Sequence, residues 1–235
     1  MPLPTSELAN PPNNLQAIFF DAAGTLFHLS EPVGTTYSRL AASLGVHATP
    51  ESLDAAFRKS WKALPPPLRP ENEPNPDDDR GWWKTLVEHT FGLAAPQPIR
   101  ADRMNALFDQ AFAYYAKAAA WRVFEDTRPA LEALRGRYRL LVLSNFDSRL
   151  RTVLEGLGLT PYFERILVSS EVGAAKPHPR MFETALRACG LPPTACLHVG
   201  DDARCDDCGA RQMGLSSFLL DRPAITLATL LEKLG

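Results

Sequence analysis

Four groups of polar residues have the types and the order that phosphoryl transfer requires, and each group follows an apolar run. Asp21 follows the first run and precedes Gly24-Thr25. The other three groups follow later runs and are Ser144-Asn145, Lys176-Pro177, and Gly200-Asp201-Asp202 with Asp206. Phosphoryl transfer needs an in-line nucleophile, positive charge on the phosphoryl oxygens and help for the leaving group. The pattern therefore predicts a phosphoryl-transfer site.

Each group has an expected role. We expect Asp21 to attack phosphorus and to form an aspartyl phosphate that water later cleaves. Because the carboxylate and the phosphate repel each other, a divalent cation is needed between them, and Mg²⁺ suits a site of oxygen ligands. The Ser144 hydroxyl and the backbone N–H of Asn145 can bind a phosphoryl oxygen near the start of a helix. Lys176, biased towards an extended backbone by Pro177, can neutralise both the phosphate and Asp21.

Together the four motifs resemble the haloacid-dehalogenase superfamily of hydrolases, over about residues 16 to 220. Two further segments, Arg-Gly-Trp-Trp-Lys at 80–84 and Leu-Ser-Asn-Phe-Asp-Ser-Arg-Leu at 143–150, are similar to the branch named for haloacid dehalogenase-like hydrolase domain-containing protein 3. The resemblance implies a Rossmann-like hydrolase core and a catalytic aspartate. It also assigns Mg²⁺ to Asp21, Asp201 and the backbone carbonyl of Ala23.

The resemblance gives supporting roles to the remaining residues. Ala22 and Ala23 contribute to substrate binding together with Asn145. Asp206 does not bind the metal directly but orients the residues that do. Asp202 is given the same supporting role, although it could also be a direct metal ligand.

Position 23 departs from the pattern, because it is alanine where this kind of site usually has a second aspartate. That carboxylate normally protonates the leaving oxygen and then activates water, and proton transfer of this kind contributes roughly 10²- to 10⁴-fold. Asp147 and His28 are candidates to replace it. Each also has a simpler interpretation: Asp147 as an acid at a helix N-terminus, and His28 as an ordinary residue leading into the next domain.

The apolar runs predict the elements that position these groups. Short runs typical of strands alternate with helical patterns such as residues 148–157 and 179–189, which favours a parallel sheet covered by helices on both faces. In such sheets the site lies beyond the carboxyl ends of the strands. The fold predicted is α/β, with a Rossmann-like parallel sheet. The predicted strands are residues 17–20, 139–143, 166–169, 196–199 and 217–220.

About 100 residues without a strand pattern separate the first two predicted strands, which is far more than a crossover needs. Apolar spacing predicts four helices there, and we interpret them as a cap inserted over the site: residues 34–44, 51–64, 81–91 and 100–119. The predicted division is a flexible tail (1–14), a hydrolase core (15–29 and 120–235) and a helical cap (30–119). We expect Trp82 and Trp83 to pack a cap helix and His198 to pack in the core. The proline-rich segment 65–80 is either a solvated loop or a substrate gate.

Composition excludes some classes of function. A formal net charge of −2 indicates no nucleic-acid surface, and no apolar run approaches the roughly 20 residues of a membrane span. With no export signal recognised, we expect a cytoplasmic protein with reduced cysteines. Cys205 and Cys208 have CxxC spacing, but a structural zinc site needs four ligands and Cys189 and Cys196 form no second pair. The oligomeric state is not indicated.

The function predicted is a Mg²⁺-dependent phosphatase that acts on a small phosphorylated metabolite through an aspartyl phosphate. Three alternatives stay open. A 2-haloacid dehalogenase also lacks the second aspartate, but its fourth motif usually lacks the pair kept at Gly200-Asp201. A phosphonatase-like enzyme needs a Schiff-base lysine, and Lys59, Lys62, Lys84 and Lys117 lie outside any recognisable motif. A binding module with little catalytic turnover is the third.

Overall fold

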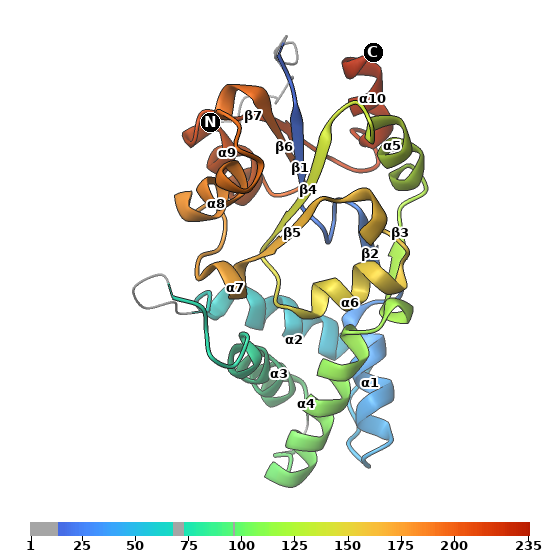
Figure 1. The fold of residues 1–235 in the computed structure, drawn as a ribbon. Helices are drawn as coiled ribbons and strands as arrows, with labels where there is room; N and C mark the ends of the chain where they lie inside the picture. The colour runs from blue at the N-terminus through green and yellow to red at the C-terminus, as the bar shows by residue number, and fades with distance from the viewer. Residues whose placement is uncertain (1–13, 68–72, 96) are drawn as a thin grey trace, which may run out of the picture.

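The core of the computed structural model is a five-stranded parallel sheet in the order β5-β4-β1-β6-β7 (Figure 1). The structure describes residues 14–67, 73–95 and 97–235, so the predicted tail lies outside the described residues except for residue 14. The α/β, Rossmann-like sheet core predicted from the sequence is confirmed. The strands are β1 (Ala17–Phe20), β4 (Arg139–Ser144), β5 (Arg165–Val168), β6 (Cys196–Gly200) and β7 (Ser216–Leu219).

Strand β1 occupies the centre of the sheet and is buried on both faces. Ile18 and Phe20 pack into one hydrophobic cluster, and Ala17 and Phe19 pack into another. This alternation is what a central parallel strand requires, because helices cover both of its faces. Phe20 is in register with both neighbours, pairing with residue 142 of β4 and residue 199 of β6. The residues that follow these three strands therefore meet at one edge of the sheet.

Helices from the second half of the chain cover the two faces of the sheet. One face packs against α5 (Thr127–Leu134), α6 (Arg149–Gly156) and α10 (Leu227–Leu234). The other packs against α8 (Pro179–Cys189) and α9 (Gly209–Gln212), with the short α7 (Ser169–Val172) leading into α8.

Helix α8 shows how local sequence determines a helix and its packing face. It starts at Pro179, where a missing N–H costs nothing, and it ends at Gly190, which has a φ of 65°. Such a left-handed residue is a common helix end. Its apolar residues recur at three- and four-residue spacing and are buried against the sheet: Met181, Phe182, Ala185 and Cys189.

A second layer of four helices lies below the sheet in Figure 1 and has its own hydrophobic cluster. Tyr37, Leu53, Phe91 and Leu107, one from each helix, are buried in it. The predicted helical cap thus consists of four helices whose ends differ from the predicted ones by a few residues. They are α1 (Val33–Ala42), α2 (Pro50–Ala63), α3 (Arg80–Ala94) and α4 (Ala101–Tyr115).

The prediction that no strand lies between β1 and β4 is wrong. The antiparallel strands β2 (Phe27–Leu29) and β3 (Trp121–Val123) pair at the junction of the two layers. Each has three residues, which is too short for a period-two pattern to stand out from its surroundings. Phe27 is fully buried with its ring 5.2 Å from that of Trp121. The pair therefore brings the two chain connections between core and cap together.

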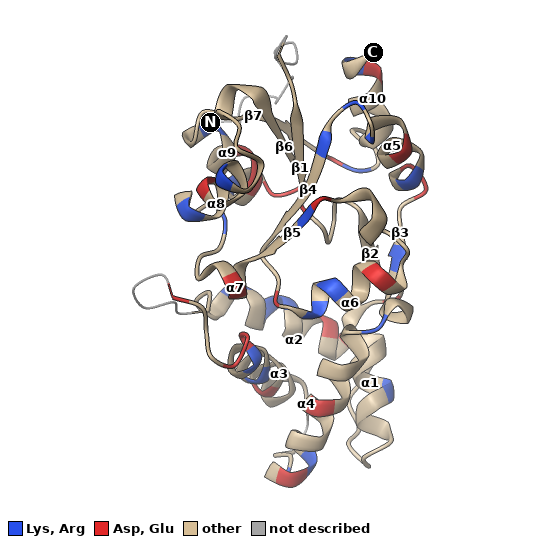
Figure 2. Ribbon diagram, viewed as in Figure 1, with Lys and Arg blue, Asp and Glu red and all other residues tan. Residues whose placement is uncertain are grey.

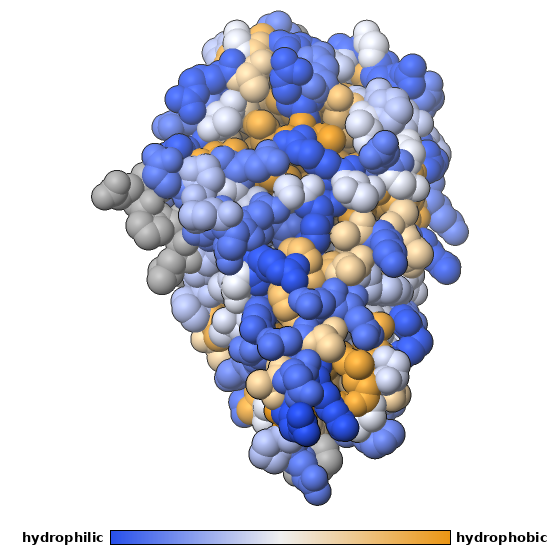
Figure 3. All heavy atoms as spheres, turned by 60° about the horizontal axis from the view of Figure 1, so that its bottom comes forward, coloured by the Kyte–Doolittle hydropathy of each residue, from blue (hydrophilic) through white to orange (hydrophobic). Residues whose placement is uncertain are grey.

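Acidic and basic residues are mixed along the ribbon of both the core and the cap in Figure 2, consistent with the formal net charge of −2. Figure 3 turns the cap end forward and shows a face that is mostly hydrophilic, with smaller apolar groups between. Among the described residues, no helix is both long and apolar enough to cross a bilayer.

Candidate active site

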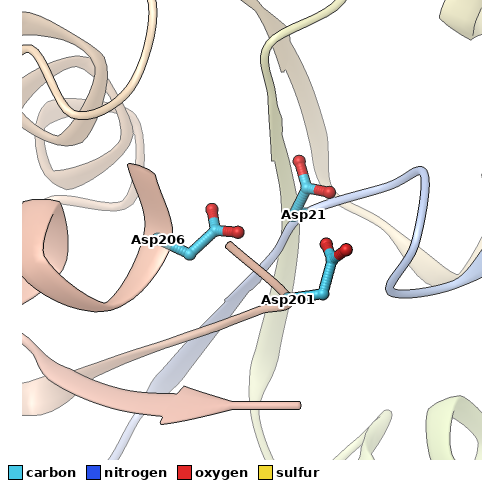
Figure 4. A group of neighbouring side chains, drawn as sticks. All are labelled: Asp21, Asp201 and Asp206. Carbon is cyan, nitrogen blue, oxygen red and sulfur yellow. The ribbon is translucent and has the colours of Figure 1, made fainter. Parts of the chain in front are cut away.

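Three aspartates from different parts of the chain converge at the edge of the sheet (Figure 4). Asp21 follows β1, Asp201 follows β6, and Asp206 lies in the helical turn Ala203–Cys208. Each offers one carboxylate oxygen, and these oxygens all lie within 4.8 Å of one another. A set of oxygen donors at this spacing fits the requirements of Mg²⁺.

Gly24 allows this close approach. Its φ is +91°, and a Cβ at position 24 would lie 2.2 Å from Oδ2 of Asp201. Any other residue would strain the backbone and displace that carboxylate. The Thr25 hydroxyl donates a hydrogen bond of 3.3 Å to Asp201 Oδ1 from the same turn. The Gly-Thr pair of the first motif thus positions the acid of the fourth motif.

Lys176 is a buried cation that links two of the aspartates. Its Nζ donates to Asp21 Oδ1 at 2.8 Å and to Asp206 Oδ1 at 2.7 Å, and the residue is 3% exposed. Burial lowers the pKa of Lys176, but the neighbouring Asp206 and Asp21 outweigh burial and hold that pKa above its usual range. Lys176 is therefore positively charged.

The two aspartates that contact Lys176 have opposite pKa shifts. Burial raises the pKa of Asp21 to about 6, and Lys176 opposes that rise. Burial also raises the pKa of Asp206, but Lys176 and a hydrogen bond with His198 outweigh it and hold that pKa well below its usual range. Asp206 is thus a permanent anion, whereas Asp21 is ionised at neutral pH without a large margin.

Both oxygens of Asp206 are engaged by the protein. Oδ1 accepts from Lys176 and from His198 Nε2 at 2.9 Å, and Oδ2 accepts from the backbone N–H of Asp202 at 3.0 Å. In the described part of the chain Asp21 receives a side-chain hydrogen bond from Lys176 alone. This difference supports the expectation that Asp21 contacts a metal directly and that Asp206 acts from behind.

His198 is buried, as expected, but it does more than pack. Burial lowers the pKa of its imidazole, so the neutral ring donates from Nε2 to Asp206. Its place inside an apolar strand hid this role in the sequence.

The Ser144-Asn145 pair lies at the end of β4, as predicted. Ser144 is buried apart from its exposure to the cavity described below. The Asn145 side chain has a role that the sequence did not reveal. Its Oδ1 accepts from the backbone N–H of Lys176 at 2.6 Å and its Nδ2 donates to the Lys176 carbonyl at 2.9 Å. Asn145 thus fixes the loop that carries the buried lysine.

The remaining predicted residues occupy the same edge of the sheet. Ala22 is fully buried, and its carbonyl accepts from the N–H of Leu26 at 2.8 Å. Ala23 lines the cavity beside Asp21. Asp202 Oδ1 accepts from two backbone N–H groups, those of Arg204 and Cys205, at 2.8 and 2.6 Å. Asp202 therefore caps the turn that contains Asp206.

A cavity of about 1000 Å³ lies between the core and the cap. At the core end of the cavity lie the charged and polar groups: Asp21, Ser144, Lys176 and Asp201. The aromatic wall comes from cap helices α2, α3 and α4: Phe57, Trp61, Trp83 and Phe112. The four predicted motifs therefore share one cavity that the cap partly encloses.

The two candidates for the missing acid are placed differently. Asp147 is buried and accepts hydrogen bonds from the guanidinium of Arg149 and from Trp83 Nε1 at 2.6 to 2.7 Å. It is an ion-pair partner and does not line the cavity. His28 does line the cavity, and its Nδ1 is 2.8 Å from the Leu29 carbonyl. Asp147 Oδ1 also accepts from the backbone N–H of Arg149 at 3.1 Å, at the start of α6, so its interpretation as an acid at a helix N-terminus fits its contacts. His28 remains open to contact with substrate.

Asp147 also joins the core to the cap, which the sequence did not predict. Trp83 Nε1 donates to it from helix α3 at 2.7 Å. Its partner Arg149 lies 3.6 Å from the ring centroid of Phe112 on α4. A second connection comes from Asp78, in the described part of the 65–80 segment, which accepts from the backbone N–H of Ser148. Trp82 and Trp83 pack against α2 through Trp61, as expected of cap residues.

The other candidate chemistries have less support. Cys205 and Cys208 are free thiols, and burial together with Asp202 raises the pKa of Cys205 to about 12, which disfavours a thiolate. Of the four lysines considered for a Schiff base, Lys62 alone is in the lining of the cavity.

The sequence model of the haloacid dehalogenase-like hydrolases matches residues 15–214, and the chain belongs to this family. One relative is the haloacid dehalogenase-like hydrolase domain-containing protein 3 of Mus musculus. It is 36% identical over 212 residues, which cover 88% of this chain and 82% of the relative. A glyceraldehyde 3-phosphate phosphatase of Methanothermobacter thermautotrophicus is 29% identical over 210 residues, which cover 88% of this chain and 86% of that protein. The resemblance carried by the four motifs is confirmed.

Solved structures share the fold. A predicted phosphoglycolate phosphatase from Haemophilus somnus has a TM-score of 0.70 and 20% identity, and the match covers 95% of this chain and 99% of the other. At that identity the likeness extends to the fold alone.

Proposed function

We propose that this hydrolase is a Mg²⁺-dependent phosphatase that acts on a small phosphorylated metabolite through an aspartyl phosphate on Asp21. The observation that carries the proposal is the placement of Asp21. Its carboxylate is joined to a buried cation, Lys176, and is grouped with two further carboxylates at the core end of a cavity. The glyceraldehyde 3-phosphate phosphatase among the relatives supports the same class of reaction.

The acidic group fits a magnesium ion, and this superfamily generally uses one. Asp21, Asp201 and the backbone carbonyl of Ala23 would hold it, with Asp206 orienting them. The ion would supply positive charge between the nucleophile and the phosphate.

The chain's own residues account for the other requirements. Asp21 supplies the attacking oxygen. The Ser144 hydroxyl donates a hydrogen bond to a phosphoryl oxygen, and Lys176 neutralises phosphoryl charge. Asn145 and Asp206 hold Lys176 in place through the contacts described above. The cap limits the access of water to the cavity.

A dehalogenase would use the same nucleophile, but the grouping of Asp201 and Asp206 with Asp21 favours a metal-dependent reaction. The test is a screen of phosphate esters with Mg²⁺ and with a chelator, alongside 2-chloropropionate. We expect phosphate release that stops with chelator and returns with Mg²⁺. Chelator-resistant release of chloride from 2-chloropropionate would show a dehalogenase instead.

A further inference from the structure

The wall of the cavity that faces the carboxylates is aromatic. Phe57 and Trp61 come from α2, Trp83 from α3 and Phe112 from α4. Three of these rings contact one another, with centroids 5.9 Å apart for Phe57 and Trp61 and 6.0 Å for Trp61 and Trp83. Trp61 is nevertheless 51% exposed. A large apolar ring that lines a cavity and stays accessible is typical of a ligand-contacting surface.

Part of this wall is fixed in orientation. The indole of Trp83 donates to the buried carboxylate of Asp147, which Arg149 holds in turn. The guanidinium of Arg149 also lies over the ring of Phe112. A ligand ring would therefore meet a prepared surface and would not need to order loose side chains.

At the core end of the cavity, the usual position of the acid for the leaving group carries none, and of the two candidates to replace it His28 alone lines the cavity, with its Nδ1 2.8 Å from the Leu29 carbonyl. Position 23 has a methyl group, and Asp147 is committed to its ion pair. A leaving oxygen must then depart without a proton from the usual position. Phenols have a pKa near that of tyrosine, about 10, so phenolates are much weaker bases than alkoxides, and an aryl oxygen can depart as its anion.

These two observations are independent and indicate the same class of substrate. We propose that the substrate is an aryl phosphate, a phosphate monoester of a phenolic hydroxyl, whose ring packs against the aromatic wall. This inference rests on the proposed phosphatase function and specifies its leaving group.

The reaction balances without a protein acid at position 23. An Asp21 oxygen bonds to phosphorus as the bond from phosphorus to the aryl oxygen breaks, and the electron pair stays on that oxygen as a phenolate. Water then displaces the Asp21 oxygen from phosphorus and releases inorganic phosphate and the free carboxylate. The proton lost by water balances the proton that the phenolate takes from solvent.

The test compares phenyl phosphate with cyclohexyl phosphate, which have rings of the same size but differ in aromaticity and in the basicity of the leaving oxygen. We expect wild-type kcat/KM to favour phenyl phosphate by roughly 10²-fold or more. Ala23→Asp supplies an acid and should raise cyclohexyl phosphate turnover by about tenfold, which is more than any rise in phenyl phosphate turnover. The ratio of kcat/KM for phenyl phosphate to kcat/KM for cyclohexyl phosphate should therefore be smaller in this variant than in the wild type.

Binding measurements on a variant that cannot react show the contribution of the aromatic wall without that of the leaving group. Asp21→Asn should bind phenyl phosphate more tightly than cyclohexyl phosphate in calorimetry. Adding Trp61→Ala should weaken binding of phenyl phosphate alone, by roughly 2- to 10-fold. Trp61→Leu keeps apolar bulk without the ring and serves if the alanine variant does not fold. Leu93→Ala is the matched control, because Leu93 is likewise an exposed apolar residue of the cap but lies on α3, outside the lining of the cavity.

The outcomes distinguish the two proposals. Equal or better turnover and binding of cyclohexyl phosphate would overturn the aryl-phosphate inference and leave the phosphatase standing. No hydrolysis of any phosphate, including acetyl phosphate with Mg²⁺, would overturn the proposed function itself.

Discussion

The two ends of the cavity are built by different means. At the core end, charged groups follow separate strands and are held by one another, with Lys176 between Asp21 and Asp206. At the cap end, aromatic rings from separate helices lie against one another, and charged groups contact them from outside: the Asp147–Arg149 pair beside Trp83, and Arg80 over the ring of Phe112. Sheet topology therefore brings the charged groups together, whereas side-chain packing within the cap forms the aromatic wall that we propose selects the leaving group.

Removing the buried cation should have the largest effect on the core end. Lys176→Met leaves two buried carboxylates without their counterion, and we expect the metal-free free energy of unfolding to fall by about 3–5 kcal/mol. Phosphatase activity should be lost. Denaturant unfolding measures the first and a phosphate-release assay the second.

Lys62→Met is the matched control, because Lys62 is an exposed cap residue in the lining of the same cavity. It should change stability by less than about 0.5 kcal/mol. Equal stability losses for the two variants would show that Lys176 does not hold the core end together.

A smaller effect should come from the cap end. Trp83→Phe keeps a ring but removes the donor to the buried Asp147, and we expect a loss of about 1–2 kcal/mol in the free energy of unfolding. KM should rise with little change in kcat, because the wall is disturbed but the core end is intact.

Trp82→Phe supplies the comparison. The indole of Trp82 donates at an exposed position to the carbonyl of Pro65, so its loss should cost less than about 0.5 kcal/mol. If Trp83→Phe and Trp82→Phe lower the free energy of unfolding by the same amount, the contact with Asp147 does not stabilise the junction of core and cap.

The smallest effect concerns pH. The pKa of Asp21 is about 6 in the folded protein, above its ordinary value of 3.8, so the folded state takes up a proton at a pH where the unfolded chain remains ionised. The contribution of Asp21 to stability should therefore increase as pH falls from 7 to 5, by about 1 kcal/mol. Metal-free wild type and Asp21→Asn are compared by denaturant unfolding at both pH values.

Mg²⁺ should remove this dependence, because a bound cation favours the ionised carboxylate. Without metal, the free energies of unfolding of wild type and Asp21→Asn could differ by the same amount at pH 5 and pH 7. That result would contradict the raised pKa of Asp21.

The sequence predicted the core end well and the cap end poorly, for a physical reason. Asp21, Ser144 and Asp201 directly follow or end strands, so the order of the strands brings them together wherever their side chains point. The link from His198 to Asp206 and the link from Asn145 to the Lys176 backbone depend on side-chain direction, which apolar runs do not encode.

In the cap, too, the sequence pattern predicted the elements but not the contacts between their side chains. Helical spacing predicted all four helices, because each has an apolar face. It did not predict that Trp83 contacts Asp147, since that contact depends on how the cap packs on the core. The three-residue strands β2 and β3 were missed because their pairing, and not their pattern, defines them.

The central claim is that Asp21 becomes covalently phosphorylated during turnover. The direct measurement is an acid quench of the enzyme reacting with phenyl phosphate and Mg²⁺, followed by peptide mass spectrometry. We predict a phosphoryl group on Asp21, accumulating because Ala23 provides no acid–base group to activate water, and absent from Asp21→Asn. Steady phosphate release without phosphorylation of Asp21, or an active Asp21→Asn variant, would contradict the account.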